Sequence, residues 1–393
     1  MAKCKIFLGI TMLLVLINCR MQRQVWFSDI QRENRHKTDG ITRIYIDKYG
    51  SIYPPDELVP RDAFFDPHGL GTEWKEIQGN GNLLDYYRTH PLAYNALALK
   101  YGVHNTTADS TGFNAVQKGI IKAYSDGLNQ KLAASESNTL VILVHGFNEP
   151  NATADFALLR EKIREVNNRD FVYLEVYWDG LTANGKPPFL VGIWGRAQLN
   201  SGYAALALRQ VLADISPDAK IRLIAHSLGS SVGTGVLFNT YEKFRDPPQD
   251  LIKKTLSGPV SPSRDIRLGM IAPAIPGTNT FRHFFKRGSG SVTKDQNNIQ
   301  RVVLGINTRD FAVSKVVGLS EKGGSTSLGG SPKEFDKTKE MLTDSLGYTP
   351  EEAALLFQKV DFYNDSEYKS EHGLRFYLMQ EQAKNEFLQK MLE

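Results

Sequence analysis

The chain has 393 residues, of which 41% are hydrophobic and 23% charged, so it is long enough to bury one large core and to carry appendages. Its formal net charge of +4 falls to about +2 if the lysines at positions 3 and 5 leave with an export signal, and this balance gives no indication of nucleic-acid binding. The two cysteines are Cys4, inside that signal, and Cys19. We therefore expect no disulfide in the mature chain.

Residues 1–18 have the pattern of an export signal. Two lysines precede an apolar stretch of about 12 residues, which is too short to span a bilayer. The stretch ends in Leu16-Ile17-Asn18-Cys19, which resembles a bacterial lipobox with asparagine in place of the usual small residue. We expect lipidation of Cys19 after cleavage, with ordinary signal-peptidase cleavage as the alternative. The mature protein is then expected in the bacterial cell envelope, as a membrane-anchored lipoprotein facing the periplasm or the surface, or otherwise periplasmic or secreted.

Residues 19–112 are expected to form an N-terminal appendage. Two short strands are predicted at 41–46 and 51–53, with Asp47-Lys48-Tyr49-Gly50 as a hairpin signal between them and two prolines at the end. The remainder carries glycines among aromatic residues. It is expected to be irregular, either packed on the core or shaping access to a substrate.

From residue 113 to 393, helical and strand patterns alternate. Apolar residues spaced by four predict a helix over 113–133, and a second helix is expected over 154–164. Near-continuous apolar runs, which are typical of buried parallel strands, occur at 140–144, 171–177, 221–225, 267–272 and 301–306. The alternation predicts an α/β fold with a mostly parallel, doubly wound sheet and helices on both faces. Residues 277–299 and 316–349 are expected to be insertions, either rim or lid segments or plain surface loops.

The run 221–230 predicts a nucleophile elbow. A strand leads directly into Ala225-His226-Ser227-Leu228-Gly229, with small residues two positions before and two after the serine. Such a turn exposes the Ser227 hydroxyl to a base and presents the Leu228 N–H to a developing oxyanion. The alternative is that this serine only begins a buried helix.

The apolar strand at 140–144 is followed by His145-Gly146-Phe147-Asn148. A loop after such a strand supplies a second oxyanion N–H, and a glycine lets the backbone approach the reacting carbonyl. We assign that N–H to Phe147. A structural role, holding the loop by hydrogen bonds, is favoured for His145 over a catalytic one.

In hydrolases built on an elbow, an acid and then a histidine follow the serine along the chain. His283 and His372 are the two histidines after Ser227, and His283 comes too early to leave room for an acid strand. His372 is therefore the expected base. The expected acid is Asp310, in the polar turn after the strand at 301–306, although such a residue also serves as an ordinary turn or helix-capping residue.

Two other carboxylates are weaker candidates for the acid. Asp361 and Asp365 lie on or after the strand-like segment 359–363 that leads to the histidine. Neither position is where this arrangement places its acid.

These segments together resemble the alpha/beta-hydrolase superfamily and, within it, bacterial esterase/lipase-like proteins of undefined substrate. The resemblance covers about residues 138–375. That family often has an aspartate after the strand at 268–273, where this chain has Ala274. The resemblance implies an alpha/beta-hydrolase fold. Because Ala274 replaces that aspartate, we assign the acid to Asp310 instead. The segments that carry the resemblance are 144–148, the helix at 154–164, 176–180, the helix at 203–212, the elbow, and 307–314.

We expect a serine hydrolase, most simply a carboxylic-ester hydrolase acting on a small or lipid-like ester through an acyl-enzyme intermediate. No cofactor or metal is expected, because the sequence contains no metal-ligand spacing. The alternatives are an acyltransferase or peptidase on the same triad, or a non-catalytic envelope lipoprotein with a hydrolase-like binding domain. Four aromatic residues either line a substrate pocket or pack in the core: Phe147, Trp178, Trp194 and Tyr203.

Overall fold

The structure is a computed structural model of the chain. It describes residues 21–22, 39–55, 82–104, 107–149, 151–180, 182–183, 190–238, 248–257, 260–281, 286–287, 290–291, 298–313, 327–363 and 370–393. The expected export signal, Cys19, His283 and Asp365 lie outside the described residues.

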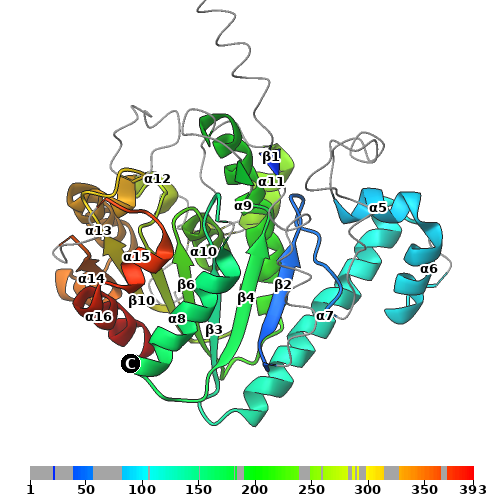
Figure 1. Cartoon of the computed structure of the whole chain (residues 1–393), viewed down its shortest axis with the longest axis horizontal. Helices are drawn as coiled ribbons and strands as arrows, with labels where there is room; N and C mark the ends of the chain where they lie inside the picture. Colours follow the sequence, from blue (N-terminus) through cyan, green and yellow to red (C-terminus); the bar gives the residue numbers. More distant parts are fainter. Residues whose placement is uncertain are drawn as a thin grey trace, which may run out of the picture.

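A parallel sheet forms the centre of the molecule (Figure 1). Among the described residues it has seven strands, in the order β11-β10-β7-β6-β3-β4-β2, and every neighbouring pair is parallel. The predicted α/β fold with a parallel sheet is confirmed. The strands are β2 (Thr42–Ile46), β3 (Thr139–Val144), β4 (Val172–Trp178), β6 (Lys220–His226), β7 (Asp265–Ile271), β10 (Ile299–Ile306) and β11 (Phe357–Asp361). Two short antiparallel pairs lie outside this sheet: β1 (Met21–Gln22) with β5 (Thr182–Ala183), and β8 (Lys286–Arg287) with β9 (Gly290–Ser291).

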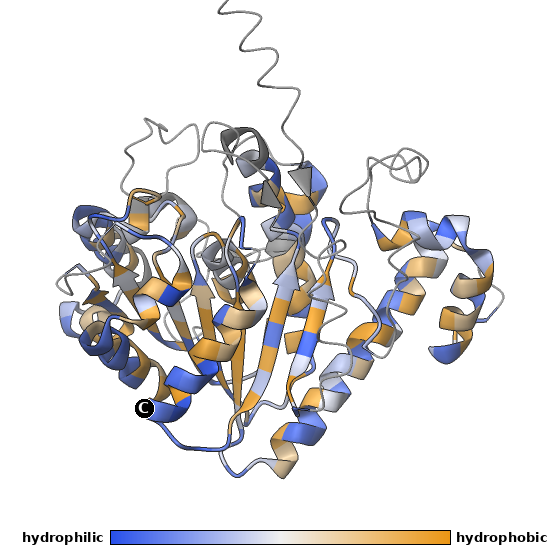
Figure 2. Cartoon of the chain, in the orientation of Figure 1, coloured by the Kyte–Doolittle hydropathy of each residue, from blue (hydrophilic) through white to orange (hydrophobic). Residues whose placement is uncertain are grey.

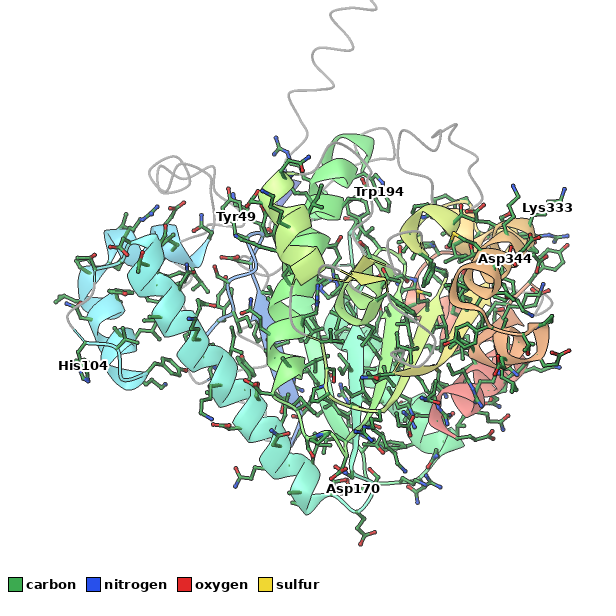
Figure 3. The ribbon with its side chains drawn as sticks, turned by 180° about the vertical axis from the view of Figure 1, so that it is seen from behind. Tyr49, His104, Asp170, Trp194, Lys333 and Asp344 are labelled. Atoms are coloured by element: carbon green, nitrogen blue, oxygen red, sulfur yellow. The ribbon has the colours of Figure 1, made fainter. Side chains whose placement is uncertain are left out.

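Helices cover both faces of the sheet. α7, α9 and α10 pack on one face, and Figure 3 shows α7 and α9 from that side, whereas α8 and α16 pack on the other face with α15 against α8. The helices are α5 (Leu83–Thr89), α6 (Pro91–Lys100), α7 (Ser110–Ala134), α8 (Ala152–Val166), α9 (Leu190–Ala213), α10 (Gly229–Phe238), α11 (Gln249–Ser257), α12 (Thr278–Phe281), α13 (Pro332–Leu346), α14 (Pro350–Leu356), α15 (Leu374–Leu378) and α16 (Glu381–Leu392), with a 3-10 turn η5 (Ser327–Gly329).

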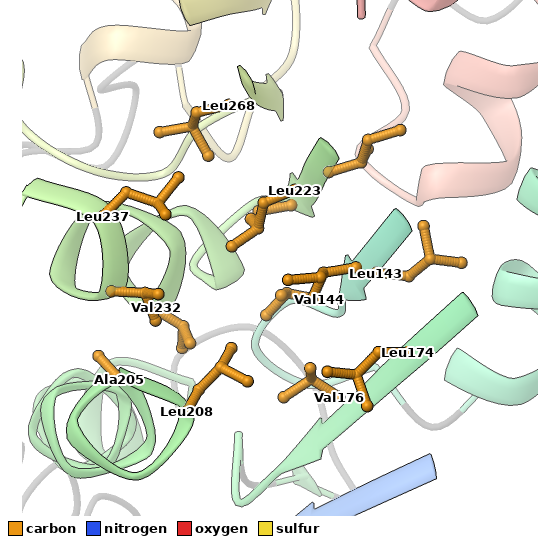
Figure 4. Close-up of a cluster of buried hydrophobic side chains, with 14 of the residues drawn as sticks. Leu143, Val144, Leu174, Val176, Ala205, Leu208, Leu223, Val232, Leu237 and Leu268 are labelled. Atoms are coloured by element: carbon orange, nitrogen blue, oxygen red, sulfur yellow. The ribbon is translucent and has the colours of Figure 1, made fainter. Parts of the chain in front are cut away.

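The core explains the apolar runs of the sequence. All six residues of β3 are buried, because helices cover both of its faces. Figure 2 shows orange stretches along the strands, interrupted by blue bands on β2 and β4. Figure 4 shows Val144 and Leu223 from the strands meeting Leu208 of α9 and Val232 of α10. Burying each such side chain contributes roughly 1.5–3 kcal/mol. This packing holds the carboxyl ends of the strands in fixed relative positions.

The N-terminal region differs from its expected form. β2 joins the main sheet as an edge strand parallel to β4, a pairing that the sequence did not predict. The turn at Asp47–Gly50 is present, with the Gly50 N–H donating to the Asp47 carbonyl at 3.0 Å, but the second strand is reduced to one bridge between Ile46 and Ile52. The segment 51–53 still pairs with the end of β2, since the Asp47 N–H donates to the Ser51 carbonyl at 2.9 Å and the Tyr53 N–H to the Tyr45 carbonyl at 3.0 Å.

Two later segments are more regular than expected. The helix predicted at 203–212 begins at Leu190, and the second half of the expected insertion 316–349 is the helix α13. Ser331 caps α13, accepting the Glu334 N–H, and Gly347 ends it with a φ of 70°. Within the described ranges, no helix is both long and apolar enough to span a membrane.

Candidate active site

Ser227 lies at a sharp turn between β6 and α10, at the carboxyl edge of the sheet. Its φ of 52° is in the left-handed region, which costs a non-glycine residue roughly 1–3 kcal/mol. A Cβ on Gly229 would lie 2.4 Å from the His145 carbonyl oxygen, and one on Gly146 would lie 2.9 Å from the Ser227 Cβ. Glycine is therefore required at both positions, and Ala225 is fully buried below the turn. The predicted elbow geometry is present.

His372 and Asp310 continue from Ser227 as one hydrogen-bonded chain, which we call the triad. The His372 Nε2 lies 2.7 Å from the Ser227 Oγ, and its Nδ1 lies 2.6 Å from an Asp310 carboxylate oxygen. Because a carboxylate only accepts, the Nδ1 carries the proton, and the Nε2 is left to accept the serine hydroxyl proton. His372 lies between β11 and α15, and Asp310 follows β10.

The surroundings of Asp310 keep it ionised. Burial by itself raises the pKa of this carboxyl, but the charge and hydrogen bond of His372 and the hydrogen bonds from Tyr377 and the Ala312 N–H outweigh it and lower the pKa. The Tyr377 hydroxyl donates to the same oxygen at 2.6 Å, and the Ala312 N–H donates to the other at 2.8 Å. The alternative acid Asp361 accepts the Tyr363 N–H instead.

Two backbone N–H groups are expected to bind an oxyanion. Those of Phe147 and Leu228 have no hydrogen-bond acceptor among the described residues. The loop that carries Phe147 lies against the elbow, since Gly146 is in contact with Ser227. Neither N–H is therefore used in backbone pairing within the described residues.

His145 orients the peptide between Gly146 and Phe147. Its Nε2 accepts the Trp178 N–H at 3.2 Å, so its Nδ1 is the protonated nitrogen and donates to the Gly146 carbonyl at 2.8 Å. In a trans peptide the N–H points opposite to the carbonyl, so the Phe147 N–H is turned away from the His145 ring. Burial lowers the pKa of His145 to about 4, which keeps it neutral. The structural role expected for this histidine agrees with these contacts.

The four aromatic residues divide between site and core. Trp178 is fully buried, and its indole N–H donates to the His145 carbonyl at 2.8 Å. Tyr203 packs edge-on against Tyr49. Phe147 and Trp194 are partly exposed and meet edge-to-face with ring centroids 5.1 Å apart, and Figure 3 shows Trp194 near the amino-terminal end of α9. Tyr203 is partly exposed as well, but Phe147 belongs to the loop beside the elbow, so this pair is the part of the set next to the triad.

Sequence reasoning missed two contacts with the triad. Tyr377 holds Asp310, and no motif signals it, because its role depends on the fold bringing α15 beside the turn after β10. His226, the residue before the serine, contacts the His372 carbonyl through its Nε2 at 2.8 Å. Its position inside the elbow motif was the available signal. In the described part of the chain, no group of three or more histidine, cysteine or acidic residues is arranged to hold a metal ion.

Comparisons with known proteins do not assign the chain to a family. No family model and no curated protein matches the chain. Among solved structures, the chain is similar to a bifunctional GH43-CE protein of Bacteroides eggerthii, with 12% identity and a TM-score of 0.28. The match covers 62% of this chain and 34% of that one, so the chain spans about a third of its length. This likeness is too weak to carry an argument about fold or function.

Proposed function

We propose that the chain is a serine hydrolase of the alpha/beta-hydrolase fold, acting on carboxylic esters. The observation that carries the proposal is the hydrogen-bonded chain from Ser227 through His372 to Asp310, with the serine in a left-handed turn. Such a turn exposes the hydroxyl to its base, and a lone buried serine would gain nothing from the strain. The order of the three residues along the chain is also that of the alpha/beta hydrolases.

In the acylation step, the Ser227 Oγ attacks the ester carbonyl carbon while its proton passes to the His372 Nε2. The carbonyl oxygen becomes an oxyanion, which accepts hydrogen bonds from the Phe147 and Leu228 N–H groups. Asp310 stabilises the imidazolium. The proton then passes to the alkoxy oxygen, the alcohol leaves, and the acyl group stays on the serine.

Water completes the cycle by the same route. His372 takes a proton from the water, whose oxygen attacks the acyl carbon, and the oxyanion again faces the two N–H groups. When the tetrahedral species collapses, His372 returns the proton to the Ser227 Oγ and the carboxylic acid is released. The ester and this water are the only reactants that the sequence uses.

The substrate is proposed to be a small or lipid-like ester, because the edge beside the Phe147 N–H carries the partly exposed rings of Phe147 and Trp194. An acyltransferase would use the same triad with an alcohol in place of water, and a peptidase would release an amine. Comparing hydrolysis of an ester with that of the matching amide, and measuring the products with and without an added alcohol, would separate esterase activity from these alternatives.

The proposal is tested with a fluorophosphonate probe on the full-length mature protein. We expect a single labelled residue, Ser227, identified by mass spectrometry, and no labelling in Ser227→Ala. Ser135→Ala is the matched control, because Ser135 precedes β3 at the opposite edge of the sheet and should label as wild type does. Labelling elsewhere, or none in a folded sample, would contradict a serine hydrolase.

We also propose an envelope location with a lipid on Cys19. An acyl chain contributes about 0.8 kcal/mol per buried methylene, so the protein should stay with membranes after a salt wash, which releases only electrostatically held proteins. Metabolic labelling with an alkyne fatty acid should mark the wild type, and Cys19→Ser should be unlabelled. An unlabelled, soluble wild-type protein would rule out the anchor without affecting the hydrolase proposal.

A further inference from the structure

His226 is a buried link between the elbow and the loop that carries His372. Its Nε2 lies 2.8 Å from the His372 carbonyl oxygen, and a carbonyl only accepts, so the proton of His226 is on Nε2. The other nitrogen, Nδ1, is buried and has no hydrogen-bond partner among the described residues. Burial and the neighbouring His372 lower the pKa of His226 to about 3, so this ring stays neutral beside the triad.

The group that faces the His226 Nδ1 is a carboxyl. Glu149 lies two residues after Phe147, and its Oε2 is 3.7 Å from that nitrogen, with only 15% of its side chain exposed. Glu149 forms a side-chain hydrogen bond to Asp155, in the first turn of α8. Burial and the nearby Asp155 raise the pKa of Glu149 to about 8, so at neutral pH Glu149 is the protonated partner and donates to Asp155.

Four elements supply the charged and polar groups around Glu149. Glu149 follows the oxyanion loop, Asp155 belongs to α8 and His226 ends β6, while Arg375 of α15 acts on both carboxyls with its positive charge. α15 packs against α8 and begins two residues after His372. On its other side His226 faces the groups of the triad and, further away, His145. The two loops that supply the proposed base and oxyanion donor therefore meet at this cluster.

We propose that Glu149, Asp155 and His226 act as a positioning cluster, which holds the His372 loop against the oxyanion loop and requires the proton shared between the two carboxyls. This inference rests on the proposed hydrolase function. None of the three residues touches the reacting atoms. They act through the His372 carbonyl and through the backbone that leads to Phe147.

Loss of the shared proton should weaken both ends of the cluster. Ionised Glu149 would place a second negative charge beside Asp155 and would face the lone pair of the His226 Nδ1 at 3.7 Å. The hydrogen bond between the carboxyls would also be lost. The consequence is a fall in kcat above pH about 8, approaching about tenfold per pH unit for a single ionisation that disables the site.

The first experiment is the pH profile of kcat and KM on an activated ester, from pH 6 to 10. The wild type should lose activity above pH about 8, and Glu149→Gln, which stays neutral, should not show that loss. Glu161→Gln is the matched control, since Glu161 lies on α8, the helix that carries Asp155, with 62% of its side chain exposed, and it should follow the wild type. The same alkaline fall in Glu149→Gln, or none in the wild type, would overturn the proposal.

Variants of His226 separate positioning from simple packing. His226→Leu removes the donor to the His372 carbonyl and should lower kcat about tenfold with little change in KM. His226→Gln keeps an N–H near the Nε2 position and should recover most of that loss. Equal losses in the two variants would contradict a role through the hydrogen bond.

Thermal unfolding tests the cluster without catalysis. A carboxyl whose folded pKa is raised contributes stability that is present at low pH and is lost as pH rises from its ordinary value toward about 8. The wild-type Tm should therefore fall over this range, and Glu149→Gln should show a shallower fall than Glu161→Gln. Equal slopes would overturn the cluster. If the slopes of Tm against pH are as expected but the fluorophosphonate does not label Ser227, the cluster stands and the hydrolase function is overturned.

Discussion

Ser227 and His372 lie 2.7 Å apart, but different kinds of interaction hold them in place. The serine is fixed by its backbone: its left-handed turn depends on glycines at 146 and 229, and its N–H donates to the Ile271 carbonyl at 3.0 Å. The histidine is fixed by polar contacts, with Asp310 on its ring and His226 on its carbonyl. We call Ser227 with its turn the serine half of the site, and His372 with its polar contacts the histidine half. Activity that depends on the serine half should be lost through steric changes, and activity that depends on the histidine half through loss of hydrogen bonds or charge.

The largest effects are expected in the histidine half. His372→Ala and Asp310→Asn should each lower kcat by about 10⁴-fold, because the hydroxyl loses its base or the base loses its tautomer. The measurement is hydrolysis of a p-nitrophenyl ester. Asp361→Asn is the control, since this carboxylate accepts the Tyr363 N–H, and it should behave like the wild type. The reverse pattern between the two aspartates would show that the acid is wrongly assigned.

A steric change should break the serine half. Gly229→Ala places a Cβ 2.4 Å from the His145 carbonyl oxygen, and backbone atoms cannot move aside easily. We expect a loss of about 2 kcal/mol in the free energy of unfolding, and slowing of fluorophosphonate labelling by about 10²-fold as the serine shifts. Gly127→Ala, in α7 with nothing within 4 Å of its Cβ, should instead stabilise by roughly 0.5–1 kcal/mol. Similar changes in unfolding free energy and labelling rate for the two substitutions would contradict a steric requirement for glycine at the serine turn.

The smallest effect concerns Tyr377. Tyr377→Phe removes one of the hydrogen bonds that keep the pKa of Asp310 low, so kcat should fall about threefold to tenfold. A lowered carboxyl pKa contributes stability above its ordinary value of 3.8, and that contribution is lost as pH falls. The wild type should thus be more stable than the variant at pH 7, and by a smaller margin at pH 2, in denaturant titrations. A constant difference at both values would assign Tyr377 to packing alone.

Local patterns predicted most of the central sheet, because a parallel strand covered on both faces must be apolar along its length. They also predicted the positions of Ser227, Asp310 and His372, since polar residues that follow parallel strands meet at one edge of the sheet. The structure brings these three side chains together, and their catalytic roles stay a prediction.

Contacts between distant segments were not predicted. The pairing of β2 with β4 depends on backbone groups that carry no residue-specific signal, so the strand was expected to belong to an appendage. The contacts of Tyr377 with Asp310 and of His226 with His372 depend on how α15 and the histidine loop pack against the elbow. Turn residues and apolar spacing contain no information about such packing.

The edge strand β2 also constrains the order in which the molecule can assemble. Arg43, on β2, donates at 2.9 Å to Glu175 of β4, which lies 132 positions later. During synthesis β2 therefore emerges long before its only sheet neighbour among the described strands exists. Closing so long a segment is slow, and until then the edge of β2 is open to pairing with other chains. β2 can therefore join the sheet only after β4 has been made.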